Sequence, residues 1–356
     1  MRVSPWPGSA SPEVRSTISA AITGWGTALP EGTLTNAELE RRVETSDEWI
    51  TERTGIKERR FALEGDTTSS LAIEAGAAAI KKAGLVPGDI DLMVMATTTP
   101  DQIIPHTGSF VSDGIGLRCG SFDLNAACAG FVYALVVGAS MLATGNLRHV
   151  LVVGAETLSR VTDPYDRGTC ILFGDGAAAF VISSVDDSSA HTPEITTDDT
   201  PGLLAWDLGC DGSLTGILEV PAGGTRRPAT HETVDARQHY ISMNGPEVFR
   251  RAVRVIVDTA TLTLERAGVG VDDVTWFAPH QANIRIIESA CGRLGLPMDR
   301  TLVNIERYGN TSAASIPLVL AEAADDGRLQ NGDLVLLSGF GAGMTWASAL
   351  VRWGTS

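Results

Sequence analysis

The feature that most constrains this sequence is an internal repeat, in which one run of helix, turn and strand occurs twice. Three pairs of segments match in the same order along the chain. They are AIKKAGLVPGDIDLMV at 79–94 with TLERAGVGVDDVTWFA at 263–278, VLVV at 150–153 with LVLL at 334–337, and FGDGAA at 173–178 with FGAGMT at 340–345. The first two pairs are offset by 184 residues and the third by 167. Ordered self-similarity of this kind predicts two duplicated halves.

Each half alternates helical and strand patterns, which is typical of the α/β fold class. A helix is expected at 71–83, ending before Gly84. The polar segment 185–240 is interpreted as linker, loops and a few strands. The expected strands are continuous apolar runs, as in sheets buried on both faces: 92–97, 149–155, 178–184 and 333–339. We therefore divide the chain into three parts: a flexible extension (1–19), an N-terminal half (20–190) and a C-terminal half (191–356).

Charge, hydropathy and cysteine content exclude several classes of function. The net charge of −16 and the pI near 4.8 argue against a nucleic-acid partner. No apolar run approaches the roughly 18 residues of a membrane span, so membrane insertion is not expected. The first 19 residues lack the apolar core of a secretion signal, and a transit peptide is the alternative to a flexible extension. The five irregularly spaced cysteines predict reduced thiols, no metal site and a cytoplasmic location.

One of these cysteines has a context that suggests a nucleophile. The repeat also pairs LNAACAGFVYAL at 124–135 with YGNTSAASIPLVL at 308–320, and the offset of 184 places Cys128 on Ser312. Cys128 would then begin a buried helix, where the helix N-terminus lowers the pKa of a thiol. From this segment alone, an inert core cysteine is the simpler interpretation.

Two polar residues of the second half are candidates to act with Cys128. His280 follows the expected strand 274–279, and open α/β sheets bind ligands at the carboxyl ends of their strands. Asn310 precedes the helix that the repeat pairs with the helix of Cys128. Taken singly, His280 could be a satisfied polar cap and Asn310 a helix N-cap. The three residues together favour one shared pocket.

At these residues the sequence resembles the β-ketoacyl-(acyl carrier protein) synthase III family, condensing enzymes that initiate type II fatty-acid synthesis. The likeness extends from about residue 20 to residue 353. It is carried by TSDEWITERTGI (45–56), AACAGF (126–131), DPYDRGT (163–169), LFGDGA (172–177), PHQANIRII (279–287), GNTSAAS (309–315) and FGAGMTW (340–346). The resemblance implies an α/β thiolase fold with five αβαβα layers from two duplicated halves, and a homodimer.

The resemblance also implies a Cys–His–Asn triad at Cys128, His280 and Asn310. Cys128 would take the acyl group from an acyl-CoA primer. His280 and Asn310 would stabilise the enolate formed when malonyl-(acyl carrier protein) loses carbon dioxide, giving a 3-oxoacyl product without a metal or redox cofactor. The backbone N–H groups of Cys128 and Ala342 would bind the oxyanion, and Phe340 would pack beside the thiol.

The same resemblance assigns residues to the two thioester-carrying partners. The expected CoA contacts are Trp49, Arg53, Arg167, Gly245, Phe249 and Asn283. The expected docking surface for the acidic acyl carrier protein is Arg250, Arg251, Arg254 and Arg285. Steering by such a basic patch is physically reasonable, and a solvated helix face is the alternative. Loop 97–107, with Ile103 and Ile104, is expected to line the acyl pocket, partly from the other subunit.

Two other functions remain open from the sequence. A starter-loading synthase or acyltransferase of a polyketide or other secondary pathway would keep the same motifs. An inactive thiolase-fold partner subunit is disfavoured, because it would not need Cys128.

Overall fold

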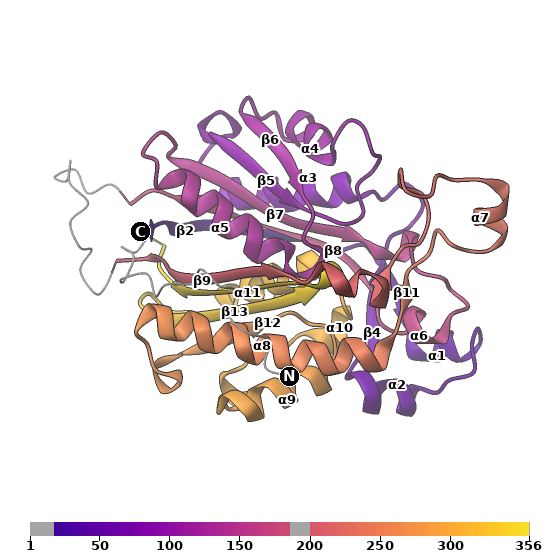
Figure 1. Cartoon of the computed structure of the whole chain (residues 1–356). Helices are drawn as coiled ribbons and strands as arrows, with labels where there is room; N and C mark the ends of the chain where they lie inside the picture. The colour runs from indigo at the N-terminus through magenta and orange to yellow at the C-terminus, as the bar shows by residue number, and fades with distance from the viewer. Residues whose placement is uncertain (1–17, 186–199, 356) are drawn as a thin grey trace.

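The computed structural model describes residues 18–185 and 200–355 (Figure 1). The expected extension 1–19 therefore lies outside the described residues, except for Ile18 and Ser19. These two form the short strand β1 (Ile18–Ser19), which pairs with a strand of the second half. The expected boundary at 190 also lies outside the described residues, so the division into halves at that point stays a prediction.

Two five-stranded sheets form the framework of the molecule. The first has the order β2 (Ala21–Ala28), β8 (Asp175–Ser183), β7 (His149–Thr157), β5 (Leu92–Ala96) and β6 (Gly120–Leu124). The second has the order β1, β9 (Gly202–Cys210), β14 (Thr345–Arg352), β13 (Leu334–Gly341) and β12 (Trp276–Pro279). Every strand expected from the apolar runs is present, which confirms those predictions.

The two sheets share one pattern of strand pairing. β8 is antiparallel to β2 and β7, and β5 is parallel to β7 and β6. In the second sheet β14 is antiparallel to β9 and β13, and β12 is parallel to β13. An isolated parallel bridge between Phe277 and Thr301 continues the pattern beyond β12. The repeat in the sequence is therefore also a repeat in topology.

Helices form three layers around the sheets (Figure 1). The outer layers are α3 (Thr68–Lys82) with α4 (Thr107–Ile115) on the first sheet, and α8 (Gly245–Ala267) with α9 (Ile284–Leu294) on the second. The helices α5 (Gly130–Leu142) and α11 (Ser315–Asp325) lie between the sheets, which completes the αβαβα thiolase fold. Among the described residues, no helix is long and apolar enough to cross a membrane.

Shorter elements gather at the end of the molecule that carries α1 and α2 (Figure 1). They are β3 (Gly32–Thr35), α1 (Asn36–Glu40), α2 (Asp47–Thr54), β4 (Glu58–Phe61), α6 (Arg167–Cys170), β10 (Leu218–Glu219), α7 (His231–Asp235), β11 (Ser242–Met243) and α10 (Ile305–Tyr308). The strands β9, β10 and the helix α7 fall in the segment 185–240, which agrees with the expected mixture of loops and strands.

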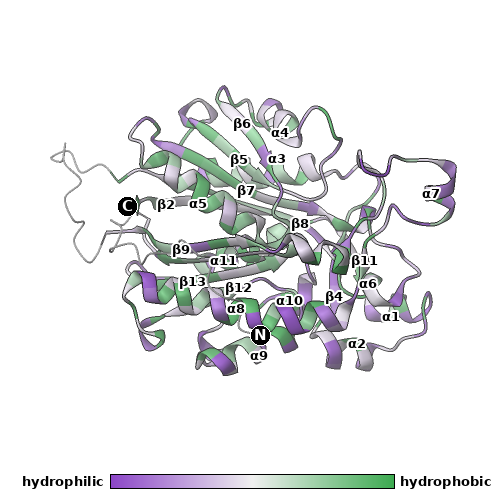
Figure 2. Cartoon of the chain, in the orientation of Figure 1, coloured by the Kyte–Doolittle hydropathy of each residue, from purple (hydrophilic) through white to green (hydrophobic). Residues whose placement is uncertain are grey.

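The central helix layer supplies the core that positions the site. Side chains of α5 such as Phe131 and Leu135, and of α11 such as Ile316 and Leu320, pack in one cluster with strands of both sheets. A helix covered on both sides must be apolar all round, and the burial of that surface is the main stabilising term. Figure 2 shows the hydrophobic character of α5 and of the neighbouring strand β5. The turns that begin α5 and α11 are consequently held at the centre of the molecule.

Candidate active site

Cys128 lies in a turn of 3-10 helix (Ala127–Ala129) that leads directly into α5. A matching turn, Ser312–Ala314, leads into α11, and the two turns contact each other. Ala127 and Ser312 begin their turns with φ angles of 48° and 47°. Such a left-handed backbone is strained for a residue with a side chain and persists only where the surroundings enforce it.

The match between the turns corrects the register of the repeat. Because Ala127 and Ser312 are equivalent, the local offset is 185 residues, and Cys128 falls one residue beyond the equivalent of Ser312. The prediction that Cys128 aligns with Ser312 is therefore wrong. Oδ1 of Asn125 accepts the Ala127 N–H at 3.2 Å, and Oδ1 of Asn310 accepts the Ser312 N–H at 2.9 Å. Asn310 is thus the counterpart of Asn125, and each carboxamide oxygen caps its own turn.

β13 passes the Cys128 turn so closely that Gly341 has no room for a side chain. A Cβ on Gly341 would lie 2.5 Å from Cys128 N, and a Cβ on Gly339 would lie 3.2 Å from Cys128 O. Glycine is therefore needed for this approach of one backbone to another. The approach brings the neighbours of Gly341, Phe340 and Ala342, to the backbone of Cys128.

His280 directly follows β12, as expected, at the carboxyl end of the strand. Its N–H donates to Ser338 O at 2.8 Å, and its ring packs edge-on against Phe340 with centroids 5.5 Å apart. Nδ1 lies 2.7 Å from Ser315 Oγ, which also accepts the Gln281 N–H at 3.4 Å. Among the described residues, Nδ1 is the one acceptor that lies within hydrogen-bond distance of the Ser315 hydroxyl, so we assign the Ser315 proton to His280 Nδ1. Nε2 then carries the ring proton.

Burial controls the ionisation of both His280 and Cys128. His280 is 1% exposed, and burial lowers its pKa to about 3, so the ring is neutral at neutral pH. Cys128 is 8% exposed, and burial raises the pKa of its thiol to about 12, although a hydrogen bond with Ser312 lowers it. The lowered thiol pKa expected at a helix N-terminus is therefore wrong. Desolvation of the thiolate outweighs the favourable end of α5.

Asn310 is fixed by its backbone to the segment that precedes β8. Its N–H donates to Leu172 O at 2.8 Å, and its carbonyl accepts the Gly174 N–H at 3.0 Å. Because Oδ1 accepts from Ser312, the donor end of the carboxamide, Nδ2, is left for a ligand.

The structure brings the three candidate residues together at the start of α11. The Ser312 side chain acts on the pKa of the Cys128 thiol. Asn310 Oδ1 accepts the Ser312 N–H, and His280 Nδ1 pairs with Ser315 Oγ. The shared pocket expected from the sequence stays a prediction.

Four of the six expected CoA contacts lie together beside α2. The guanidinium groups of Arg53 and Arg167 lie 5.9 Å and 5.1 Å from the centroid of the Trp49 ring. Asn283 Nδ2 donates to Arg53 O at 3.0 Å. The other two lie on the first turns of α8: Gly245 and Phe249.

Three of the four expected docking arginines are paired with acids of their own helix, α8. The pairs are Arg250 with Glu247, Arg251 with Glu247 at 2.8 Å, and Arg254 with Asp258 at 3.4 Å. Exposed pairs of this kind contribute little to stability and can exchange for a partner's acids. Arg285 lies in the first turn of α9, on a different helix.

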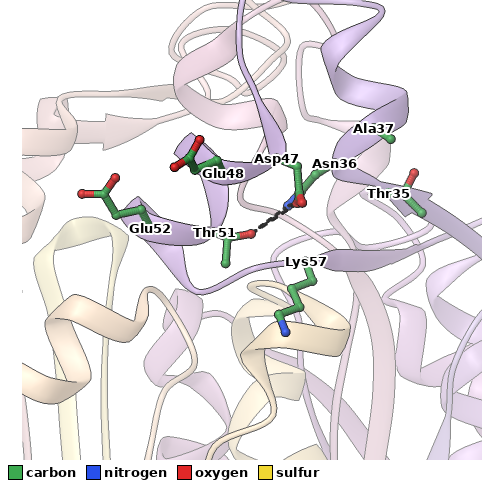
Figure 3. Close-up of a pocket in the computed structure, with 8 residues that line it drawn as sticks. All are labelled: Thr35, Asn36, Ala37, Asp47, Glu48, Thr51, Glu52 and Lys57. Atoms are coloured by element: carbon green, nitrogen blue, oxygen red, sulfur yellow. Dashed lines mark hydrogen bonds between the residues drawn. The ribbon is translucent and has the colours of Figure 1, made fainter.

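A separate polar pocket of about 820 Å³ contains none of the expected site residues (Figure 3). It is lined by Thr35, Asn36, Ala37, Asp47, Glu48, Thr51, Glu52 and Lys57. Asp47 already accepts a hydrogen bond from Asn36 Nδ2 at 2.8 Å. Within residues 18–185 and 200–355, no group of three or more His, Cys, Asp or Glu side chains is placed to hold a metal ion. We assign this pocket no role in the chemistry.

Two polar residues beside Cys128 are not among those expected from the sequence. Ser312 lies on the turn that contacts the Cys128 turn, and its side chain acts to lower the pKa of the thiol. Glu156, on β7, is a fully buried carboxyl group. A signal for Glu156 was present, because a carboxylate within an otherwise apolar strand is seldom buried without a partner.

Comparison with known proteins identifies the family. Residues 122–199 match the family described as 3-oxoacyl-(acyl-carrier-protein (ACP)) synthase III, and residues 264–353 match its C-terminal region. The β-ketoacyl-(acyl-carrier-protein) synthase III of Roseiflexus castenholzii is 50% identical, covering 94% of this chain and 98% of the relative. The 3-oxoacyl-(acyl-carrier-protein) synthase III structure from Aquifex aeolicus is 40% identical with a TM-score of 0.84, covering 94% of this chain and 100% of that one.

A structure of the priming β-ketosynthase from a polyketide biosynthetic pathway is more distant in sequence. It is 34% identical with a TM-score of 0.84, covering 97% of this chain and 99% of that one. The identity to β-ketoacyl-(acyl-carrier-protein) synthases III is higher over nearly the full length of both chains. This chain therefore belongs to the β-ketoacyl-(acyl-carrier-protein) synthase III family, the acyltransferase-type condensing enzymes of the thiolase fold.

Proposed function

We propose that this chain condenses an acyl-CoA primer with malonyl-(acyl carrier protein), and so initiates fatty-acid synthesis. The observation that carries the proposal is the meeting of a thiol, a neutral imidazole and a carboxamide at the start of α11. Family membership supports it, and the polyketide alternative has the weaker support of a 34% identical relative.

In the first step, Cys128 attacks the thioester carbonyl of the primer and becomes acylated. The negative charge that develops on the carbonyl oxygen needs donors held in place beforehand. We assign these to the N–H groups of Cys128 and Ala342, because β13 approaches Cys128 N most closely at Gly341. Phe340, which lies on this strand, packs edge-on against His280 and shapes the pocket.

In the second step, malonyl-(acyl carrier protein) loses carbon dioxide and charge develops on its thioester oxygen. His280 Nε2 and Asn310 Nδ2 are the two donors that can stabilise this enolate. A neutral ring with a fixed tautomer suits the role, since the proton is donated in a hydrogen bond and not transferred. The carbanion attacks the acyl group on Cys128 and expels the thiolate. Decarboxylation itself supplies the carbanion, so we propose no metal or redox cofactor.

The two partners would enter past different helices. The adenine of CoA would stack at Trp49 between Arg53 and Arg167, because an indole flanked by guanidinium groups offers flat surfaces to a base. The pantetheine arm would pass Asn283, Gly245 and Phe249. The acidic acyl carrier protein would dock on the arginines of α8 and on Arg285. The surface pairs with Glu247 and Asp258 can exchange at low cost.

We propose a homodimer formed through the edge of the first sheet. β6 is the last strand of that sheet and its free edge can pair with a second copy. Ile103 and Ile104 are 79% and 83% exposed, and Phe122 on β6 is 38% exposed. Apolar side chains gathered at a strand edge indicate a partner. We also propose a cytoplasmic location, since all five cysteines are free thiols.

The acylation step is tested by measuring the intact mass of the protein after mixing with acetyl-, isobutyryl- or longer acyl-CoA. We expect a gain of one acyl group in the wild-type chain and none in Cys128→Ala, because Cys128 is the proposed carrier. Cys291→Ala, which removes another buried thiol, is the matched control and should acylate normally. Acylation that persists in Cys128→Ala would contradict the assignment.

The decarboxylation step is tested with malonyl-(acyl carrier protein) alone, by following the release of carbon dioxide. We expect His280→Ala and Asn310→Asp to slow release by about 100-fold or more while acylation of Cys128 is retained. Asn310→Asp keeps an acceptor for the Ser312 N–H and replaces the donor with a carboxylate oxygen, whose negative charge opposes the enolate. Equal loss of both half-reactions would refute this division of roles.

The same assay makes a pH prediction. A neutral His280 with a pKa of about 3 should keep the rate of decarboxylation constant as the pH falls through 6.5, the ordinary value for histidine. Protonation, and loss of activity from this cause, begins only as the pH approaches 3. A sigmoidal loss centred at 6.5 that disappears in His280→Ala would show that the ring titrates normally.

The two partner sites are tested by a crossed pair of variants. Trp49→Ala should raise the KM for acyl-CoA about tenfold through lost stacking and leave the KM for malonyl-(acyl carrier protein) unchanged. Arg285→Glu should do the reverse, because charge reversal weakens encounter with an acidic protein. Each variant is the control for the other. A change of both KM values in either variant would count against separate sites.

The assembly is tested by the mass of the protein in solution, measured by sedimentation equilibrium. We expect twice the chain mass of 37.4 kDa. Phe122→Glu should shift the equilibrium toward the monomer, whereas Leu63→Glu, at a 48% exposed apolar residue away from β6, should not. A wild-type monomer would rule out the dimer.

A further inference from the structure

Glu156 is a fully buried carboxyl group near the end of β7. The condensation mechanism proposed above gives it no role. It accepts hydrogen bonds from the loop that follows β5. Thr99 Oγ1 lies at 2.5 Å, Thr98 Oγ1 at 2.9 Å, Thr98 N at 3.1 Å and Thr97 Oγ1 at 3.3 Å. These donors hold the carboxyl in place at the carboxyl ends of two neighbouring parallel strands, where such folds carry their chemistry.

Ser312 joins this carboxyl group to the nucleophile. The turn that begins at Ser312 contacts both the Cys128 turn and β7. A Cβ on Gly154 of β7 would lie 2.4 Å from Ala313 O, and Glu156, two residues further along, faces the same side of the strand. The Ser312 hydroxyl acts on the pKa of both the Cys128 thiol and the Glu156 carboxyl, lowering each against the effect of burial. The equivalent residue of the other turn is Ala127, which has the same φ, so the turn itself does not require a hydroxyl. The link from Asn310 uses the Ser312 N–H and not the side chain. The turn therefore does not need the Ser312 hydroxyl for its structure, and the hydroxyl is available to act on Cys128 and Glu156.

The charge of the buried site favours transfer of the thiol proton to Glu156 over its release to solvent. A carboxylate fixed beside the thiol raises the thiol's pKa and opposes its ionisation if the proton leaves for solvent. If the carboxyl group takes up that proton, the buried site contains one negative charge both before and after the transfer. Burial also raises the pKa of Glu156 and so makes it a better acceptor.

We propose that Ser312 and Glu156 form a proton relay for the acylation of Cys128. As Sγ bonds to the acyl carbon, Ser312 Oγ accepts the thiol proton and passes its own proton to the Glu156 carboxylate. When the bond between the acyl carbon and the CoA sulfur breaks, the proton returns through Ser312 to that sulfur, and CoA leaves as a thiol. The Cys128 thiolate expelled by the condensation then takes up the one proton that the overall reaction consumes.

In this relay Glu156 is a positioning residue, because it touches no reacting atom and acts through Ser312. The inference rests on the proposed role of Cys128 as acyl carrier. It adds to that role a route for the proton, which a buried thiol with a raised pKa requires.

The test is the single-turnover rate of Cys128 acylation by acetyl-CoA, followed by intact mass. Glu156→Gln keeps the size of the side chain and removes its ability to accept a proton, and Ser312→Ala interrupts the relay at its middle. We expect both to slow acylation by about 100-fold. Decarboxylation of malonyl-(acyl carrier protein) should continue at the wild-type rate, because His280 and Asn310 are unchanged. Ala127 shows that alanine is accepted at the backbone angle of Ser312, so this variant should fold.

Asp175→Asn is the matched control. Asp175 is also a fully buried carboxyl group, but it accepts from the N–H groups of Ala62 and Ser159 and should leave acylation unchanged. Faster acylation in Glu156→Gln would show that the carboxylate acts only as a like charge, and would overturn the relay. Equal losses of acylation and decarboxylation, or normal acylation in Ser312→Ala, would overturn it as well. A wild-type chain that is never acylated at Cys128 would instead refute the proposed function on which the relay rests.

Discussion

The contact between two strained turns at the centre of the molecule is the constraint on which the site depends. Each turn begins with a non-glycine residue at a left-handed φ, 48° at Ala127 and 47° at Ser312, which costs about 1–3 kcal/mol per residue. The strain persists because α5 and α11, which follow the turns, are packed between two sheets and cannot rotate. If a turn relaxed to ordinary backbone, Cys128 would leave both the Ser312 hydroxyl and the backbone of Gly341.

The same enclosure determines the chemistry. Burial removes charge from both reacting groups, since it lowers the pKa of His280 to about 3 and raises that of Cys128 to about 12. A neutral imidazole is suited to donating a hydrogen bond to an enolate. A protonated thiol is a poor nucleophile, so the property that favours the second step obstructs the first. The proton of the thiol must therefore have an acceptor inside the site, and Glu156 is the buried carboxyl group that Ser312 connects to it.

The sequence predicted the fold well because its signals are long. Continuous apolar strands, the repeat and the family motifs extend over many residues, and an error at any one position does not change the conclusion. The register of Cys128 against Ser312 was wrong by one residue because a single inserted residue between two runs of small amino acids leaves the hydrophobic pattern unchanged. The thiol pKa was wrong because burial depends on layers that are distant in sequence. For the same reason, no local pattern could connect Glu156, on β7, with a hydroxyl on the turn before α11.

Duplication explains how one pair of turns came to serve two purposes. Asn125 and Asn310 make the same hydrogen bond, from a carboxamide oxygen to the N–H that begins the turn. Because both halves make this bond, it is part of the common fold. Only Nδ2 of Asn310 is therefore available for a function that the first half lacks. The halves differ in what surrounds this shared geometry, because Asn125 is exposed while Asn310 is 6% exposed and faces the buried centre. The first turn presents a thiol at Cys128, and the second presents a carboxamide and a hydroxyl. The symmetric fold thereby places the nucleophile opposite a hydroxyl and a carboxamide of the other half, and neither half alone contains all three groups.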